Sequence, residues 1–436
     1  MNSFKSHEKQ TEFDVAIIGG GPAGITACLE LSKSSQLMVV LFERERDLGG
    51  VPRSCHVFFG MRDRKRIYKG PTYARKLDHL ARKTSAKIET QATVLRINVG
   101  SPGEPHEILV VSPDGLRSYK SRFVILATGC FEASRQARFI PGTRPAGVFT
   151  TGSLQRVVNL QHQKPGKRAL VIGSGKVALS SVMTLKAAGA SVVGMVEEDS
   201  QLQTYPLAVK GISLFYRFPI YKATELKSIF GHERVEGVEL MGTNDQKPFQ
   251  IECDTVLITG KFHPDSQLLD TAPIGRDPLT SGPLVDMSLM TTVPNIFAAG
   301  NVLRGGDMHD LCALEGRMAA QTILRRLQSA EHEPDEVISI QTESPIRYVV
   351  PQKITPSKIK SHLFRWLFPG YSIQLERTLS NPCIEAWSGD GKIWEGSFRR
   401  LFGNSRISLP VDKFDWDRVD GNKGITLKVQ SAKKSW

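Results

Sequence analysis

Apolar residues in the first part of the chain fall into short runs that flank a helical pattern. Residues 15–18 form one run and residues 37–42 a second. Between them, Ala27, Cys28 and Leu31 recur at helical spacing. Short apolar runs on either side of a helix are typical of parallel strands that are buried on both faces. The pattern therefore predicts a β-α-β unit and an α/β fold.

The same organisation returns in the middle of the chain. Residues 168–172 form an apolar run, residues 179–188 a helical pattern, and residues 190–196 a second apolar run. Such an internal duplication is more informative than either copy alone. It predicts two Rossmann-like three-layer α/β domains, the second inserted in the first. The first is assigned to residues 12–150 and 263–330, and the second to residues 151–262.

The remaining segments complete these units and add a third. The pattern predicts a helix over residues 73–83, a strand over 87–98, a hairpin at 113–115, a β-meander before a strand at 255–258, and a helix from about 310 to 328. Residues 331–336 are polar and contain Pro334, which indicates a linker. Apolar and polar residues then alternate at 384–387, 392–394 and 425–429, which predicts a small β-rich domain over residues 340–436.

The first β-α-β unit carries a dinucleotide-binding fingerprint. Gly19, Gly21 and Gly24 follow the strand, and Glu43 ends the next strand 19 positions after Gly24. The first glycine suits a tight turn, the second lets the backbone approach a pyrophosphate, and the third lets helix and strand pack closely. Glu43 can accept hydrogen bonds from ribose hydroxyls. Pro22 and Ala23 complete the loop that would hold the phosphates.

The second unit carries a related fingerprint. Gly173, Gly175 and Ala178 follow its first strand, and Glu197 and Glu198 end its second strand. Carboxylates at that position hydrogen-bond a ribose 2′-hydroxyl and repel a 2′-phosphate, so they favour NAD over NADP. Lys176 is the only base in the loop, too little to reverse that preference.

Charge is unevenly distributed along the 436 residues, whose formal net charge is +13. Residues 44–87 hold 13 Lys or Arg and 4 Asp or Glu, and residues 340–436 hold 16 and 9. One interpretation of this charge is solvated basic surface. Alternatively, the first segment lies near an anionic cofactor or substrate, and the second binds an acidic partner or an anionic membrane surface. No nucleic-acid-binding signature accompanies the charge, so we expect no nucleic acid.

Cysteine usage and the N-terminus favour a cytoplasmic protein. The six cysteines contain no Cys-x-x-Cys, so neither a disulfide framework nor a metal site is predicted. The first 13 residues are polar and lack the apolar core of a signal peptide. No apolar run reaches 18 residues, so we expect no transmembrane segment.

Three motifs in order resemble those of the two-dinucleotide-binding flavoproteins, the pyridine nucleotide-disulfide oxidoreductase-like superfamily. They are GGGPAG with its distal Glu43, the strand that ends Ala127-Thr128-Gly129, and the segment Thr291-x-x-x-x-Ile296-Phe297-Ala298-x-Gly300. More narrowly, the segments at residues 49–77, 150–158 and 297–320 resemble the flavoprotein subunits of hydrogen cyanide synthase and opine oxidases. The resemblance implies FAD on the first unit and NAD(H) on the second.

The resemblance also implies roles for individual residues. Arg44 would lie against the adenine, and Asn301 stands where many relatives have an Asp that binds the ribityl chain. The helix that begins near residue 310 would point its N-terminus at the flavin pyrimidine, with Cys312 in its first turn packing there or tuning the flavin. The residues expected to close on the FAD are Gly50, Thr128, Gly129 and Gly300.

The chain departs from the disulfide reductases of this superfamily. Only Cys55 follows Gly49-Gly50, where those enzymes have a cysteine pair, so we expect no redox disulfide. Hydride transfer would then depend on the flavin, NAD(H) and a small amine or amino-acid-type substrate. His56, Arg53 and Arg62 are the catalytic candidates, His56 as an acid or base and the arginines as a carboxylate clamp. The alternative is an electron-relay or structural flavoprotein subunit of a heteromeric dehydrogenase, with a degenerate second nucleotide site.

Overall fold

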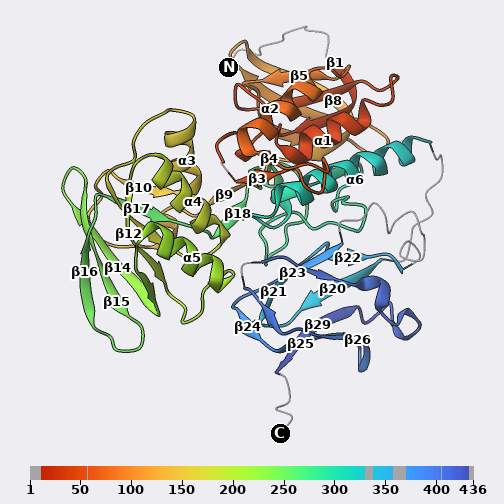
Figure 1. Cartoon of the computed structure of the whole chain (residues 1–436). Helices are drawn as coiled ribbons and strands as arrows, with labels where there is room; N and C mark the ends of the chain where they lie inside the picture. Colours follow the sequence, from red (N-terminus) through yellow and green to blue (C-terminus); the bar gives the residue numbers. More distant parts are fainter. Residues whose placement is uncertain (1–10, 56, 329–336, 357–369, 404, 432–436) are drawn as a thin grey trace, which may run out of the picture.

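Three modules make up the protein in the computed structural model, which describes residues 11–55, 57–328, 337–356, 370–403 and 405–431. Figure 1 shows the first module at the top, the second at the left and the C-terminal module below. The predicted α/β class with an added β-rich C-terminal module is confirmed. The predicted linker at 331–336 lies outside the described residues, as does His56.

The first module is a sheet of strand order β5-β2-β1-β8-β7-β6, with β19 also pairing β8. Helices α1 and α6 pack on one another over this sheet (Figure 1). The elements are β1 (Thr11–Ile18), α1 (Pro22–Leu31), β2 (Val39–Glu43), α2 (Gly70–Ala81), β5 (Lys87–Thr90), β6 (Thr93–Asn98), β7 (His106–Ser112), β8 (Gly115–Leu126), β19 (Ile296–Ala298) and α6 (His309–Gln328). Strands β3 (Phe58–Phe59) and β4 (Tyr68–Lys69) form a separate small pair.

Two predictions of local structure in this module had different outcomes. The hairpin is confirmed, because β7 pairs antiparallel with β8 and Gly115 at the turn has φ +111°. The single strand predicted over residues 87–98 is wrong. Gln91 takes the left-handed φ of 54°, which ends β5 beside β2 and lets β6 start again beside β7.

The second module repeats the parallel organisation. Its sheet has the order β10-β17-β11-β12-β13, and a three-stranded antiparallel sheet β14-β15-β16 lies beside it. The elements are β10 (Val148–Thr150), α3 (Thr151–Asn159), β11 (Arg168–Ile172), α4 (Lys176–Ala187), β12 (Ser191–Glu197), α5 (Pro206–Tyr216), β13 (Ile220–Lys222), β14 (Thr224–Gly231), β15 (Val235–Gly242), β16 (Pro248–Glu252) and β17 (Thr255–Ile258).

The boundary between the two modules differs from the sequence assignment. Strand β10 pairs with β17, and Gly142 and Ala146 form bridges to Ile229 and Arg234 of the second module. Residues 142–150, which the sequence analysis placed in the first domain, therefore pair with the second. The two connections between the modules run through β9 (Cys130–Glu132) and β18 (Phe262–Pro264), which pair antiparallel.

In the described residues, the C-terminal module consists of β-strands and two short 3₁₀ helices, Val411–Lys413 and Trp416–Arg418. The main sheet has the order β22-β20-β29-β25-β26, and a second sheet has the order β21-β23-β28. The strands are β20 (Ile338–Thr342), β21 (Ile346–Val350), β22 (Lys353–Ile354), β23 (Tyr371–Leu375), β24 (Leu379–Ser380), β25 (Pro382–Ser388), β26 (Gly391–Ser397), β27 (Arg400–Leu401), β28 (Ile407–Leu409) and β29 (Ile425–Ser431). In the described part of the chain, no helix is both long and apolar enough to cross a membrane.

Candidate functional site

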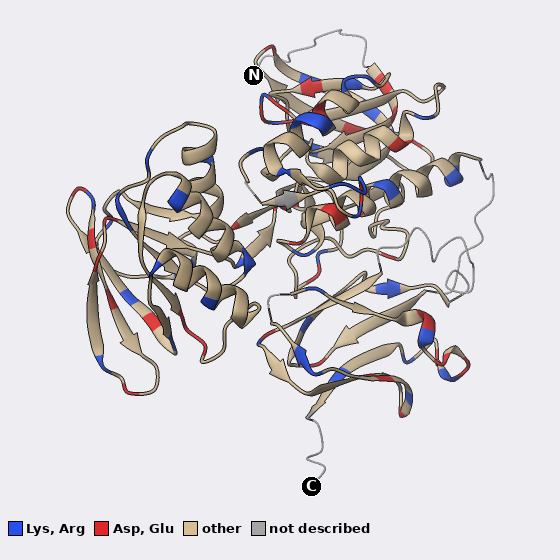
Figure 2. Ribbon diagram, viewed as in Figure 1, with Lys and Arg blue, Asp and Glu red and all other residues tan. Residues whose placement is uncertain are grey.

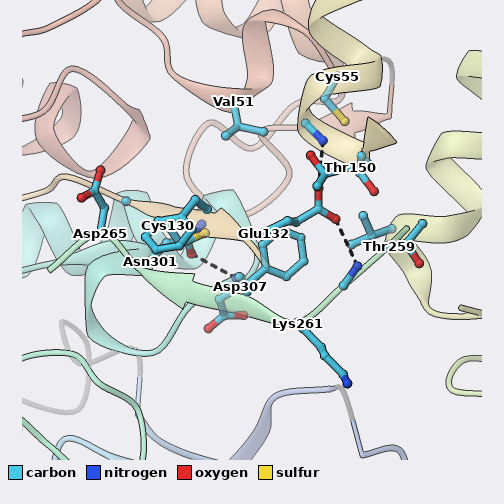
Figure 3. A pocket seen from close by; sticks show the side chains of 18 of the residues that line it. Val51, Cys55, Cys130, Glu132, Thr150, Thr259, Lys261, Asp265, Asn301 and Asp307 are labelled. Atoms are coloured by element: carbon cyan, nitrogen blue, oxygen red, sulfur yellow. Dashed lines mark hydrogen bonds between the residues drawn. The ribbon is translucent and has the colours of Figure 1, made fainter. Parts of the chain in front are cut away.

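One large cavity of about 1820 Å³ is bounded by all three modules. Pockets for a single small ligand usually enclose roughly 300–1,000 Å³, so this cavity has room for more than one. Both glycine fingerprints line it. Figure 3 shows its middle part, where Cys130 and Glu132 of β9 approach Asn301 and Thr259.

The first fingerprint adopts the geometry that its glycines predict. Gly19 has φ +113°, and a Cβ there would lie 2.3 Å from the carbonyl oxygen of Ala127. A Cβ at Gly24 would lie 1.9 Å from the carbonyl oxygen of Gly19, so only glycine allows α1 to pack this closely. A Cβ at Gly21, by contrast, would meet nothing within 4 Å. The backbone of Gly21 therefore faces open space at the N-terminus of α1, which begins with Pro22 and Ala23.

Glu43 is buried at the end of β2, where its carboxylate holds the fingerprint loop. Its Oε2 accepts from the backbone N–H of Gly20 at 2.7 Å and its Oε1 from that of Glu45 at 2.8 Å. Each carboxylate oxygen has a second lone pair for a ribose hydroxyl. Arg44 lines the cavity beside it and pairs with Asp265 at 3.0 Å, with its side chain largely exposed.

Small residues also border the cavity beyond the fingerprint. Gly129 has φ +84° and open space where a Cβ would be. Thr128 donates its hydroxyl to the carbonyl oxygen of Asp265 at 2.6 Å, which fixes the strand end. Gly50 has φ +60° and lies against Gly21, since a Cβ there would be 3.0 Å from the Cα of Gly21. The structure therefore brings these three predicted residues to the same wall.

Asn301 lies in a 3₁₀ turn before α6, close to Cys312 of α6 and Cys130 of β9. Its Oδ1 accepts from the thiol of Cys312 at 3.1 Å. It also accepts from the backbone N–H of Asp307 at 3.0 Å (Figure 3). Burial raises the pKa of Cys130 to about 12, although a hydrogen bond to Asn301 opposes this. Burial also raises the pKa of Cys312 well above the usual value. Both thiols are therefore neutral at neutral pH, and the sequence analysis missed Cys130 because one Cys after Ala-Thr-Gly carries no motif.

This wall fits an extended dinucleotide. The open space at Gly21 and Gly129 would be filled by side chains at any other residue type, and the buried acid Glu43 lies at the ribose position. Gly300, with φ +83°, faces Ala23 at the start of α1, where a Cβ would come within 3.0 Å. Glu43 and Asn301 line the same cavity, as two residues that contact different parts of one FAD would have to.

The second fingerprint reproduces the first in its contacts. Glu197 accepts from the backbone N–H and the hydroxyl of Ser174 at 3.0 and 2.5 Å, and from the N–H of Asp199 at 3.1 Å. Burial raises the pKa of Glu197, against the opposing hydrogen bond from Ser174. Glu198 is exposed and lines the cavity. A Cβ at Gly175 would meet nothing within 4 Å, so the approach to this loop is open.

The remaining residues of the second fingerprint have structural positions. Gly173 has φ +105° and a Cβ there would lie 2.5 Å from the hydroxyl of Thr259. Ala178 is fully buried in α4. Both pack the loop rather than face a ligand, as the first and third positions of such a fingerprint should.

The three catalytic candidates lie in different surroundings. Arg53 lines the cavity and pairs with Asp47 at 2.8 Å. Arg62 is not among the residues that line the cavity, and its Nη1 lies 3.2 Å from a carboxylate oxygen of Asp310. His56 lies outside the described residues. The catalytic roles of all three remain predictions.

His309, which the sequence analysis missed, lies at the first residue of α6 and lines the cavity. Its ring centroid is 4.1 Å from that of Phe59 and 5.3 Å from that of Tyr73. Its Nε2 accepts from the backbone N–H of Gly60 at 2.9 Å. Burial lowers the pKa of His309 to about 4, with Asp310 opposing the shift. The imidazole is therefore neutral at pH 7, and its Nδ1 carries the proton.

Glu132, also missed, holds together the two connections between the modules. Its Oε2 accepts from the N–H of Gly152 at 2.9 Å and its Oε1 from that of Gly260 at 3.1 Å (Figure 3). Burial raises the pKa of this carboxyl, against the two backbone hydrogen bonds. Arg138 donates to the carbonyl oxygens of Thr259 and Gly260 on the same connection.

Some of the basic side chains at residues 44–87 form ion pairs. Arg82 pairs with Asp78, Lys87 with Glu89 and Arg64 with Asp63. Figure 2 shows blue and red residues mixed over the three modules. Arg44 and Arg53 of this segment line the cavity, so both solvated surface and an anionic ligand remain open interpretations of the charge.

The described cysteines are all free. Cys55 is buried, and its Sγ lies 3.7 Å from the hydroxyl of Ser180 on α4 and 3.8 Å from the amide of Gln155 on α3. It therefore packs between the first and second modules without another cysteine in contact.

Known proteins resemble this chain over its first two modules. The sequence profile of the family described as pyridine nucleotide-disulphide oxidoreductase matches residues 13–332. The HcnB component of hydrogen cyanide synthase from Pseudomonas aeruginosa is 27% identical over 350 residues, which cover 74% of this chain and 72% of that protein. An opine oxidase subunit of Agrobacterium tumefaciens is 24% identical over 367 residues, which cover 76% and 68%.

Solved structures show the same fold. Thioredoxin reductase from T. acidophilum superposes with a TM-score of 0.62 at 21% identity, covering 73% of this chain and all of that one. The bacillithiol disulfide reductase of Bacillus cereus superposes with a TM-score of 0.59 at 19% identity, covering 72% of this chain and all of that one. The profile match ends at residue 332, before the described strands of the C-terminal module.

Proposed function

The chain belongs to the pyridine nucleotide-disulphide oxidoreductase family, and from that premise we propose that it transfers hydride between FAD and NAD(H) or a small amine or amino-acid-type substrate, without a redox disulfide. The observation that carries the proposal is one cavity lined by two glycine fingerprints, each closed by a buried glutamate. A cavity with both sites lets two redox partners bind the same protein.

FAD on the first module would supply the hydride chemistry itself. The chain's own residues would bind the FAD and orient it. The backbone at Gly21 and the N-terminus of α1 stabilise the pyrophosphate, and Glu43 accepts from the adenosine ribose. Asn301 still has an amide N–H₂ to donate, because its Oδ1 already accepts from Cys312 and Asp307. The N-terminus of α6 and the neutral His309 would offer N–H donors to the negative charge that develops on a bound flavin when it is reduced.

The second module would hold NAD(H). Gly175 leaves room for the pyrophosphate, and Glu197 and Glu198 stand at the ribose position. Glu198 is the exposed acid of the two, so it is the residue we expect to repel the 2′-phosphate of NADPH.

A substrate of amino-acid type is supported by the charges on the C-terminal side of the cavity. Arg347 and Glu376 line it there and both are exposed. A guanidinium and a carboxylate at one site suit the two charges of a zwitterion. Similarity to proteins named as subunits of hydrogen cyanide synthase and of opine oxidase also supports a small nitrogen-containing substrate and a partner oxidoreductase protein.

The relay function remains the second candidate, because several relatives are named as subunits or a small chain. The open loop at Gly175 and the retained contacts of Glu197 favour an active second site over a degenerate one.

The experiment that tests FAD binding is the replacement Gly21→Val. Gly21 has φ −81° and a Cβ there would meet nothing within 4 Å, so the protein tolerates valine while the ligand does not. Gly211→Val on α5 is the matched control, because it also faces open space but does not line the cavity.

We expect wild type and Gly211→Val to purify with about one FAD per chain, and Gly21→Val to retain less than about a tenth of that. Flavin content is measured by absorbance after heat release. Equal flavin in Gly21→Val and the control would contradict the assignment of FAD to the first module.

A further inference from the structure

Four charged side chains are buried together between α6 and the C-terminal module. Arg304, Asp307, Glu315 and Arg406 each have a side chain that is at most 8% exposed. Arg304 lies 2.9 Å from Asp307 and 2.5 Å from Glu315. Arg406 lies 2.8 Å from Asp307 and 3.3 Å from Glu315. The two cations and two anions balance, which buried charges require.

Arg406 is the only member that the C-terminal module contributes. It lies just before β28, and its Nη2 also donates to the carbonyl oxygen of Gly370 at 3.2 Å. The other three lie between residues 304 and 315, inside the family match that ends at residue 332. Arg406, which lies outside the residues that match the family, therefore balances the charges of three residues that lie inside them.

Both carboxylate residues act directly on the segment that borders the cavity at Asn301. Glu315 accepts from the backbone N–H of Gly300 at 3.0 Å through its Oε2. The backbone N–H of Asp307 donates to Oδ1 of Asn301 at 3.0 Å. A change in the position of either residue is therefore passed to Gly300 and Asn301, at the wall assigned to the ribityl chain.

The charge of the set also bears on the flavin. Without Arg406, one guanidinium would face two carboxylates, leaving a net negative charge among side chains that are at most 5% exposed. Buried charges interact strongly because the local dielectric is low. Reduction of a flavin adds negative charge, so an uncompensated carboxylate nearby opposes reduction.

We propose that Arg406 is a positioning residue for the flavin site, by which the C-terminal module holds the Gly300–Asn301 segment and keeps its surroundings electrically neutral. The inference rests on the proposed function, and it makes the C-terminal module part of the redox site. The cavity supports this, because Tyr348, Ser405 and Arg406 of the module line it together with Asp307.

The test compares Arg406→Met, Arg406→Lys, and Arg406→Met combined with Asp307→Asn. Methionine removes the charge, lysine keeps it, and the double replacement returns the set to neutrality while leaving the backbone N–H of residue 307 in place. Arg418→Met is the matched control, since Arg418 is an exposed arginine of the same module that pairs with Asp415. The readouts are the flavin content, the midpoint potential of the bound flavin, and the thermal midpoint of the protein after flavin removal.

We expect the equilibrium constant for two-electron flavin reduction to fall about tenfold in Arg406→Met, a drop of about 30 mV in the midpoint potential. Arg406→Lys and the double variant should recover most of the potential, and Arg418→Met should match wild type. If Arg406 only stabilised the fold, Arg406→Met would lower the thermal midpoint and leave the midpoint potential of the flavin unchanged. An unchanged potential in Arg406→Met that still contains flavin would therefore overturn the inference. Loss of flavin from Arg406→Met that the double variant does not restore would also overturn the role of charge. A wild-type protein without flavin would instead overturn the proposed function, and this inference with it.

Discussion

His309 begins α6 with its ring enclosed by Phe59 and Tyr73. Burial lowers its pKa to about 4, whereas the unfolded chain has an ordinary histidine pKa near 6.5. Between these values the unfolded state binds more protons than the folded state. The contribution of His309 to stability is therefore fully present above about pH 6.5 and is lost as the pH falls towards 4.

We predict that His309→Gln reduces the loss of stability between pH 7 and pH 4.5 by about 1–2 kcal/mol, allowing for the partial exposure of the ring. Urea unfolding at the two pH values, with the exposed His79→Gln as control, measures this difference. Equal pH dependence in wild type and His309→Gln would contradict the shifted pKa.

Sequence alone could predict residues whose expected roles depend on their neighbours along the chain. Gly21 and Gly175 were found because a strand, a glycine loop and a helix follow one another along the chain. His309 and Glu132 were missed because their partners, Gly60 and Gly260, are 249 and 128 positions away. A pattern of neighbouring residues cannot predict a contact between residues so far apart in the sequence.

At the scale of elements, the connections between the modules depend on β9 and β18. Glu132 joins them to the first turn of α3, because its two oxygens accept from Gly152 and Gly260. A carboxylate can accept both hydrogen bonds, but an amide offers one oxygen and directs N–H₂ at the second donor. The backbone N–H of Gly152 or Gly260 then loses its acceptor, which destabilises the junction.

We predict that Glu132→Gln lowers the free energy of unfolding by about 0.5–1.5 kcal/mol and increases proteolysis near residues 133–150. Glu233→Gln, an exposed acid in the second module, is the control. Limited proteolysis followed by mass spectrometry locates the cuts. Unchanged stability and an unchanged cleavage pattern would show that Glu132 does not hold the connections.

Helices whose apolar residues recur at regular helical spacing were predicted from the sequence, and helices without that regular spacing were missed. Helix α6, predicted over about 310–328, spans His309–Gln328. Helix α5 was not predicted, since Leu207, Leu214 and Phe215 are exposed while Val209 is buried, so apolar residues on both faces hide its period. Helix α3 was also missed, although Thr150 and Ser153 form a capping box at its start.

At the scale of the molecule, the C-terminal module contacts both other modules. Besides Arg406, Phe402 packs on Tyr205 with ring centroids 5.3 Å apart, and Arg400 donates to Gln201 at 3.0 Å. The sequence predicted this module as a β-rich unit, but it could not predict where the module docks. Its charge left solvated surface, an acidic partner and an anionic membrane surface open; the structure adds that one of its bases, Arg406, is buried in ion pairs with the first module.

The first and second modules also meet directly beside the cavity. Arg156 of α3 pairs with Glu45 through two contacts of 3.0 and 3.2 Å, and Asn159 donates to the carbonyl oxygen of Ser54. These contacts hold the two fingerprint-bearing modules against a shared cavity. The central claim is that both sites work together in electron transfer.

Anaerobic titration of the purified protein with NADH, followed at the flavin absorbance band, tests this claim most directly. We predict that NADH reduces the flavin fully, that NADPH does so at least about tenfold more slowly, and that Glu198→Arg narrows the difference, because the repulsion of the 2′-phosphate is removed. Glu233→Arg should behave as wild type. If a chemical reductant bleaches the flavin while neither NADH nor NADPH does, the second site is inactive and the account of hydride transfer between the two cofactors is contradicted.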